Sequence, residues 1–177
     1  KRRPQHGDAV EGMVVTVDRG RYRIQLGPDR EQPLPGDGVQ VVAMRARELG
    51  RKTIAVGDWV SVVGDVSGQV DALARIVRIA DRDTVLRRTA DDADPFERVV
   101  VANADQLAIV ASLADPPPSI GLIDRCVVAA LTAGIEPVLF LTKSDLADPA
   151  DLIANYVELD VRVLVTGRGG DLGELRE

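Results

Sequence analysis

The stretch that decides the fold of the second half of the chain is Val138-Leu139-Phe140-Leu141-Thr142-Lys143-Ser144-Asp145. Its apolar run predicts a strand buried on both faces of a parallel sheet. The polar residues follow at the point where this strand ends, and open α/β sheets bind their ligands at the carboxyl ends of strands. The stretch therefore predicts a parallel sheet and, at its edge, a binding site.

The sequence around this stretch alternates between strand and helix patterns. The nearly continuous apolar run Leu107–Leu113 predicts another strand buried on both faces, and residues 161–165 predict a third strand. Two helices are predicted from apolar residues at three- and four-residue spacing: Ile120, Ile123, Val127 and Leu131 in the first, and Leu152, Ile153, Tyr156 and Leu159 in the second. Ser119 is the expected N-cap of the first helix, and Gly134 follows its end. Strand–helix–strand–helix–strand is typical of a parallel α/β sheet.

The first half has the pattern of an all-β module. Short apolar or alternating runs predict strands near residues 10–17, 22–26, 39–43, 57–63, 73–79 and 84–88, with Gly- and Pro-rich turns between them. Such a set indicates a small closed barrel, and the OB-fold is the member of that class that we expect. We place the domain boundary at the charged, turn-prone segment Asp91–Pro95. The predicted domains are thus an OB-fold RNA-binding domain at 1–90 and part of an α/β domain at 91–177.

Charge is distributed unevenly between these halves. Residues 1–90 contain 16 Lys and Arg against 12 Asp and Glu, an excess of four positive charges, whereas residues 91–177 contain 6 against 16, an excess of ten negative charges. A basic module joined to an acidic one indicates two different partners, with RNA as the expected partner of the basic half. Uneven solvation of the surface is the alternative explanation.

The composition argues against several kinds of chemistry. A single cysteine, Cys126, and a single histidine, His6, cannot supply the four ligands of a zinc site or readily form a Cys-His or Ser-His-Asp hydrolase. No apolar run reaches the roughly 20 residues that span a bilayer. The basic N-terminus is not followed by the apolar stretch of a secretory signal. We therefore expect a cytoplasmic protein without a membrane partner.

The polar residues that follow the strand predicted at 138–141 can recognise guanine. The carboxylate of Asp145 can accept hydrogen bonds from N1–H and the exocyclic amine of guanine, a donor pair that adenine lacks. The aliphatic stem of Lys143 can lie along the base, and Thr142 can tie the loop to neighbouring backbone. This tetrapeptide, with Ser144 at its free position, resembles the [NT]KxD motif of GTPases. A solvated polar turn is the simpler explanation of the same residues.

A second strand end supports this interpretation. Thr166-Gly167 follows the third strand, where GTPases place small residues whose backbone N–H meets the guanine carbonyl, although Ser-Ala is the usual pair there. No G-x-x-x-x-G-K-[ST] phosphate loop occurs in the 177 residues, and more than a hundred residues precede Thr142. Either the protein is not a GTPase, or the order of its motifs is permuted and the phosphate loop lies beyond Glu177. No catalytic or metal-binding residue is therefore predicted in this chain.

The resemblance to a known family is more specific. Segments 98–107, 123–125, 134–137 and 141–146, together with Val56-Gly57-Asp58-Trp59-Val60 and Arg87-Arg88, resemble the ribosome small-subunit-dependent GTPases of the RsgA (YjeQ) family. The resemblance implies an OB barrel joined to a circularly permuted, P-loop GTPase-like domain. It also implies GTP and Mg²⁺ as ligands of the complete protein, zinc in a C-terminal domain outside this chain, and hydrolysis stimulated by the small (30S) ribosomal subunit during its late maturation. The guanine motif transfers onto Thr142–Asp145, and Ala102-Asn103-Ala104-Asp105 marks the family without an assigned chemical role.

The expected partners are the small ribosomal subunit, its 16S rRNA and a guanine nucleotide, bound by a monomer. Because Tyr22 and Trp59 are the only aromatic residues of the first half, we expect contact with phosphates rather than base stacking. The candidates are the basic residues of the first half: Arg19, Arg21, Arg23, Arg45, Arg47, Arg51 and Lys52. These 177 residues alone are expected to be inactive. The alternatives are a non-catalytic OB-fold RNA-binding adaptor with a scaffold α/β domain, and a nucleotide enzyme of another kind.

Overall fold

The computed structural model describes residues 6–27, 30, 38–50, 52–88, 98–159 and 161–170. The chain divides into two compact units, Lys1–Asn103 and Ala104–Glu177. The boundary predicted between residues 90 and 91 falls outside the described residues. None of the helices in the described part combines the length and the apolar composition needed to cross a membrane.

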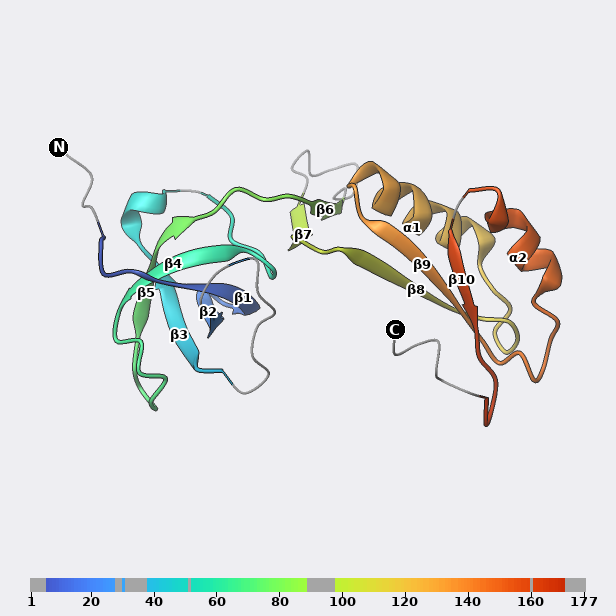
Figure 1. Cartoon of the computed structure of the whole chain (residues 1–177), viewed down its shortest axis with the longest axis horizontal. Helices are drawn as coiled ribbons and strands as arrows, with labels where there is room; N and C mark the ends of the chain where they lie inside the picture. The colour runs from blue at the N-terminus through green and yellow to red at the C-terminus, as the bar shows by residue number, and fades with distance from the viewer. Residues whose placement is uncertain are drawn as a thin grey trace. The chain divides into compact units, whose positions relative to one another are not determined.

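The first unit contains a closed five-stranded barrel (Figure 1). Its strands are β1 (Val10–Asp18), β2 (Arg21–Leu26), β3 (Gln40–Arg45), β4 (Trp59–Gly64) and β5 (Ala74–Ile79), and the short 3₁₀ helix η1 (Arg47–Leu49) follows β3. The strands pair in the order β1-β2-β3-β5-β4, and β4 closes the barrel on β1. Among these five described strands, the β3–β5 pair is parallel and the other pairs are antiparallel. The predicted OB-type barrel is confirmed.

The barrel interior follows from the alternation of side chains along each strand. In β2, Tyr22 and Ile24 are buried while Arg21 and Arg23 are exposed. The β-branched residues of the other strands complete the closed core: Val14, Val41, Val62 and Ile76, each at most 1% exposed. The β1–β2 hairpin turns at Arg19 and Gly20, which both adopt positive φ angles. Alternation thus leaves the basic side chains of β2 on the outside of the barrel.

The predicted strand at 84–88 does not belong to the barrel. Its residues form β6 (Val85–Arg88), which pairs antiparallel with β7 (Arg98–Ala102) in a separate two-stranded sheet. The pattern predicted a strand correctly, but five strands already close the barrel, so that a sixth has no free edge to join. This hairpin is fixed to the barrel by a bridge between Val56 and Val101, with a hydrogen bond of 2.9 Å from Ala102 N to Val56 O.

Two residues at this contact, Gly57 and Asn103, belong to the segments that resemble the RsgA family, and each has a structural role there. Gly57 has φ +86°, and a Cβ atom there would lie 1.9 Å from Ala102 O, so only glycine fits. Asn103 adopts φ +53° and donates from Nδ2 to Gly57 O at 2.8 Å, while its Oδ1 accepts from Asp83 N at 2.8 Å. The role of Asn103 is therefore structural, as a turn residue that ties the end of β7 to the barrel.

The second unit is a parallel α/β sheet. Its elements are β8 (Gln106–Ser112), α1 (Ile120–Thr132), β9 (Glu136–Thr142), α2 (Ala150–Val157) and β10 (Arg162–Val165), and the strand order is β10-β9-β8. Both helices lie along one side of the sheet in Figure 1. They pack their buried residues, among them Ile123, Val127 and Tyr156, against Leu139 and Leu141 of the central strand. The predicted fold class, a barrel followed by a parallel-sheet segment, is confirmed.

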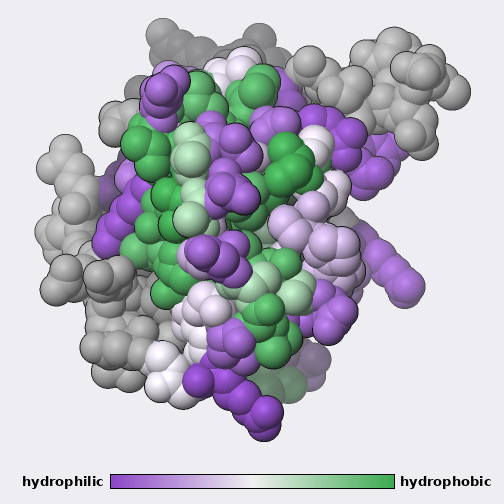
Figure 2. Space-filling view, turned by 90° about the vertical axis from the view of Figure 1, so that its right-hand side faces the viewer, coloured by the Kyte–Doolittle hydropathy of each residue, from purple (hydrophilic) through white to green (hydrophobic). Residues whose placement is uncertain are grey.

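Burial differs from the sequence prediction at several positions. Strand β8 is not buried on both faces, because Ala108 and Val110 are exposed, the latter at 69%. In α1, Ile120 and Leu131 are exposed and Ala130 is buried instead. Leu159 lies beyond α2 and is also exposed, and Ser119 makes no side-chain capping bond. Apolar residues, shown in green, accordingly reach the surface between hydrophilic ones in Figure 2.

Candidate functional site

The loop after β9 is held by polar contacts to the loop after β8. Thr142 Oγ1 donates to Ala111 O at 3.3 Å, and Thr142 O accepts from Leu113 N at 3.0 Å. Lys143 has φ +61° and directs its Nζ to Ala114 O at 3.0 Å and to the Asp115 carbonyl. The ammonium group is thus fixed by main-chain carbonyls, so the stem of Lys143 is held in one direction.

The loop after β10 joins the same cluster. Thr166 N donates to Leu141 O at 2.8 Å, and Ser144 N donates to Thr166 O at 3.2 Å. This reciprocal pairing continues the parallel register of β9 and β10, in which Leu141 lies opposite Val165. The structure therefore brings all six predicted site residues, Thr142, Lys143, Ser144, Asp145, Thr166 and Gly167, together at one edge of the sheet.

Asp145 presents an exposed carboxylate at this edge. Its Oδ1 accepts a hydrogen bond from Arg168 N at 3.0 Å, which fixes the side chain next to the second loop. Among the described residues no cation forms a salt bridge with Asp145. A carboxylate oriented by a main-chain N–H, with acceptor capacity remaining, suits a ligand that offers neighbouring N–H donors.

Gly167 brings the two loops into close contact. A Cβ atom at this position would lie 2.8 Å from Ser144 Oγ and 3.1 Å from both Asp145 N and Asp145 Oδ1. Such distances are shorter than normal van der Waals contacts, so a side chain would displace the carboxylate. The glycine is therefore part of the geometry that positions Asp145.

Helix packing behind this edge involves one of the family-signature residues. Tyr156 of α2 is 1% exposed and donates its hydroxyl to Asp124 Oδ1 of α1 at 2.8 Å. Burial first, and then the hydrogen bond to Asp124 and its negative charge, raise the pKa of Tyr156 to about 12. Asp124 thus connects the two helices.

Three of the predicted basic residues, Arg21, Arg23 and Arg45, lie in two places on the barrel. Arg21 and Arg23 line a pocket of about 500 Å³ with Val42 and the loop Gln69–Leu73. Arg45, by contrast, donates to Lys52 O at 3.1 Å on the loop that precedes β4. Arg51 lies outside the described residues. Trp59 and Tyr22 are 7% and 8% exposed, so neither offers a face on which a base could stack.

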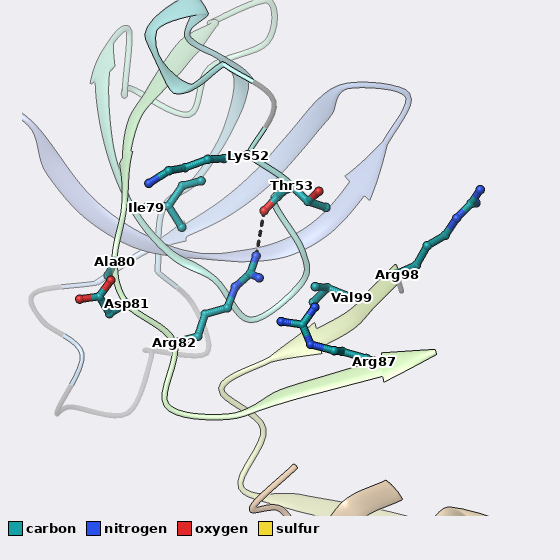
Figure 3. Close-up of a pocket in the computed structure, with 9 residues that line it drawn as sticks. All are labelled: Lys52, Thr53, Ile79, Ala80, Asp81, Arg82, Arg87, Arg98 and Val99. Atoms are coloured by element: carbon teal, nitrogen blue, oxygen red, sulfur yellow. Dashed lines mark hydrogen bonds between the residues drawn. The ribbon is translucent and has the colours of Figure 1, made fainter. Parts of the chain in front are cut away.

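Sequence reasoning missed a second basic area in the first unit. Lys52, Arg82, Arg87 and Arg98 line a cleft of about 710 Å³ that also contains Asp81 (Figure 3). Arg82 is fixed there by the fully buried Asp58, with Nε–Oδ1 and Nη2–Oδ2 distances of 2.6 and 2.8 Å. The hydrogen bond to Asp58 raises the pKa of Arg82. The sequence signals were Lys52, one of the predicted RNA contacts, and the Arg87-Arg88 pair, but nothing in the sequence places them in one cleft with Arg82 and Arg98.

The resemblance implies Mg²⁺ and zinc for the complete protein. Within the described residues no group of three or more His, Cys, Asp or Glu side chains lies close enough to hold a metal ion. The edge of the sheet offers one carboxylate, small polar side chains and main-chain groups, a set that fits a base rather than Mg²⁺ or zinc.

An OB-type barrel followed by a parallel sheet with a guanine-type motif, and no phosphate loop before that motif, defines the fold of circularly permuted GTPases. Two solved structures share this fold. YjeQ from Thermotoga maritima matches with a TM-score of 0.67 and 24% identity, over 95% of this chain and 56% of that chain. The circularly permuted GTPase YloQ matches with a TM-score of 0.65 and 23% identity, over 99% of this chain and 57% of that chain.

The chain belongs to the RsgA GTPase family, whose model matches residues 79–176. A small ribosomal subunit biogenesis GTPase RsgA of Thermosynechococcus vestitus is 33% identical over 145 positions, which cover 79% of this chain and 36% of the relative. RsgA 1 of Vibrio vulnificus is 36% identical over 184 positions, which cover 96% of this chain and 47% of the relative. The chain spans between about a third and just over half of the curated relatives it matches.

Proposed function

We propose that this chain supplies the RNA-binding barrel and the guanine-reading part of a GTPase that assists late maturation of the small ribosomal subunit. The observation that carries the proposal is the exposed, oriented carboxylate of Asp145 at the end of β9, in contact with the loop after β10. Membership of the RsgA GTPase family and the similarity to small ribosomal subunit biogenesis GTPases support the same activity and partner.

Each residue of the edge has a distinct role in this proposal. Asp145 accepts hydrogen bonds from N1–H and the exocyclic amine of guanine, while the held stem of Lys143 lies along the base. Thr142 and Ser144 fix the loop through Ala111 O and Thr166 O. The main chain at Thr166-Gly167 is proposed to bind the guanine carbonyl. The site distinguishes guanine from adenine because adenine would leave the carboxylate without donors.

The proposal assigns phosphate binding, Mg²⁺ and hydrolysis to residues that this chain does not contain. The phosphates carry most of the charge that a nucleotide site binds, and a phosphate loop holds them through main-chain N–H groups. We therefore expect weak or undetectable binding of GTP, and no hydrolysis, by the 177 residues alone. Zinc is assigned by the family resemblance to a further domain, and stimulation by the 30S subunit is a property of the complete protein.

The barrel is the proposed contact for 16S rRNA. Exposed Arg21 and Arg23 on β2 face the pocket formed with the loop between β4 and β5, which is the surface that OB-folds use for nucleic acids. The absence of an accessible aromatic face there, among the described residues, favours contact with phosphates over base stacking. A monomer acting on ribosomal subunits in the cytoplasm is part of the same proposal.

The guanine assignment is tested with a ¹⁵N-labelled sample of this chain and millimolar guanosine, inosine or adenosine monophosphate. We expect guanosine monophosphate to shift the amide signals of the loops after β9 and β10. Inosine lacks the exocyclic amine, so its monophosphate should bind about tenfold more weakly, as expected for loss of a hydrogen bond to a charged acceptor worth roughly 1.5–3 kcal/mol. Equal shifts with adenosine monophosphate would refute guanine recognition.

Substitutions separate the base site from non-specific effects. Asp145→Asn should abolish the preference for guanosine over inosine, because the amide replaces an acceptor by a donor. Asp151→Asn, an exposed substitution in the first turn of α2, is the matched control and should leave the preference unchanged. Competition between guanine and adenine nucleotides on the complete protein then tests the GTPase as a whole. An RNA-binding protein that discriminates neither base would instead be the non-catalytic adaptor.

A further inference from the structure

A cleft in the first unit has the composition of a phosphate-binding surface. It has a volume of about 710 Å³, and nine residues from four segments of the chain line it. The four basic side chains are Lys52, Arg82, Arg87 and Arg98, and the one acidic side chain is Asp81. Figure 3 shows Lys52 and Thr53 on one side of the cleft and the hairpin residues Arg87 and Arg98 on the other, with Arg82 between them.

We propose that this cleft binds the phosphodiester backbone of structured RNA, as a second contact of the barrel unit besides the face that carries Arg21 and Arg23. The proposal rests on the RNA-binding function proposed above, and it assigns to that function a site formed by the β6–β7 hairpin. The site is distinct because none of its lining residues belongs to the Arg21–Arg23 pocket.

The centre of the cleft is rigid. Arg82 donates Nε and Nη2 to the fully buried Asp58 and a further bond from Nη2 to Thr53 O at 2.8 Å. These contacts involve two of the three guanidinium nitrogens, and Nη1 makes no hydrogen bond with the described residues. Asp58 also accepts from Ala55 N at 2.8 Å, so the loop before β4 is fixed with the arginine. An arginine fixed in this way presents its remaining donor without further loss of side-chain entropy.

The outer cations come from elements that the fold fixes against each other. Arg87 and Arg98 are exposed and lie on facing strands of the hairpin, where Arg87 pairs with Val99 and Arg98 with Arg88. Lys52 is exposed on the barrel loop across the cleft. Cations spread along a cleft match the successive charges of a nucleic-acid backbone, whereas a single anion would need donors that converge on one point.

The remaining lining residues argue against a base or a free nucleotide as the ligand. They are Thr53, Ile79, Ala80 and Val99, and none of the nine has an aromatic ring on which a base could stack. Recognition would depend on charge and on the shape of the backbone, as is usual for double-stranded RNA. The ligand class is therefore an RNA backbone rather than a mononucleotide.

The test measures binding of a fluorescein-labelled RNA duplex to the 177-residue chain by anisotropy over a series of salt concentrations. The double variant Arg87→Gln/Arg98→Gln should bind more weakly. Its slope of log affinity against log salt should be smaller by about one for each lost phosphate contact. The variant Asp81→Asn should bind more tightly than the unmodified chain, because it removes the acidic side chain of the cleft. Asp81 contributes a main-chain carbonyl, and not its carboxylate, to the bond with Arg30, so this change preserves that contact.

The control variant Arg21→Gln/Arg23→Gln separates the cleft from the general RNA function. If only this control weakens binding, or if Asp81→Asn leaves the affinity unchanged, the cleft proposal is overturned while RNA binding by the barrel stands. If the unmodified chain does not bind the duplex, both proposals fail. Preferential binding of polyglutamate would identify the cleft as a site for an acidic polypeptide and would also overturn the proposal. If the cleft binds RNA as proposed, RNA should also shift the amide signals of Lys52 and Thr53.

Discussion

The ion pair between Asp58 and Arg82 should determine the stability of the barrel. Asp58 has no exposed surface and accepts from Ala55 N and from two nitrogens of Arg82. The variant Asp58→Ala leaves the guanidinium of Arg82 without its partner and the Ala55 N–H without an acceptor. Removing one member of a buried ion pair costs about 3–5 kcal/mol. Since the Arg82 side chain is 19% exposed, we expect about 3 kcal/mol, at the lower end of that range.

The chain contains a convenient reporter of this change. Trp59 is the only tryptophan, follows Asp58 directly and is 7% exposed in the barrel unit. Its fluorescence therefore follows unfolding of the barrel in urea, independently of the α/β unit. With a urea dependence of roughly 1.5–2 kcal/mol per molar, a loss of about 3 kcal/mol lowers the midpoint by about 1.5–2 M.

Matched variants separate the ion pair from a general loss of charge. Asp65→Asn removes an exposed carboxylate of the same barrel that accepts from Ser67 N at 3.1 Å, and it should lower the urea midpoint far less than Asp58→Ala does. Arg82→Met should be at least as damaging as Asp58→Ala, because it leaves a buried carboxylate unpaired. The double variant Asp58→Ala/Arg82→Met should lose less stability than the sum of the losses in the two single variants. A midpoint shift below about 0.5 M for Asp58→Ala, or strict additivity in the double variant, would refute this account.

Three further outcomes are expected from the structure. Gly57→Ala should destabilise the barrel, because its Cβ would lie 1.9 Å from Ala102 O. In urea unfolding it should lower the stability more than Gly50→Ala, where φ is also positive but the space is open. The raised pKa of Tyr156 stabilises the fold fully below the unfolded pKa near 10, and this contribution disappears as the pH rises through the folded pKa of about 12. The unmodified chain should therefore lose stability between about pH 10 and pH 12, and Tyr156→Phe should remove this loss. The same pH profile in the variant as in the unmodified chain would contradict this prediction. Gly167→Ala should weaken guanosine monophosphate binding in the amide-shift titration while thermal unfolding changes little, and unchanged binding would show that the close contact has no part in the site.

Local periodicity predicted the strands and helices because it reports which faces of an element are apolar. It could not predict where a strand pairs, so residues 84–88 were placed in the barrel although they form a hairpin with β7. Likewise, the apolar run of β8 predicts burial on both faces, which is wrong for Ala108 and Val110. The sequence records that Val110 is hydrophobic, but its exposure depends on whether other residues cover that face of the sheet.

Contacts between distant residues were the least predictable. Asp58 and Arg82 are separated by 24 positions and lie on different loops. The sequence around either residue does not indicate that the other is its partner. The sequence marks Asn103 as a residue of the family and favours a turn there, but its positive φ and its bond to Gly57 O are visible only in three dimensions. Such pairs depend on how the barrel closes, which is a property of the whole unit.

The guanine edge was more predictable, because the carboxyl ends of neighbouring parallel strands must meet. Two loops that follow β9 and β10 therefore lie together, whatever their exact residues. The departure of Thr166-Gly167 from the usual Ser-Ala looked like a weakness of the motif. In the structure, Ser144 Oγ occupies the space that an alanine methyl group at 167 would need, at a distance of 2.8 Å. The glycine and the serine thus compensate each other, and a Ser144→Ala variant should tolerate alanine at 167 better than the unmodified chain does.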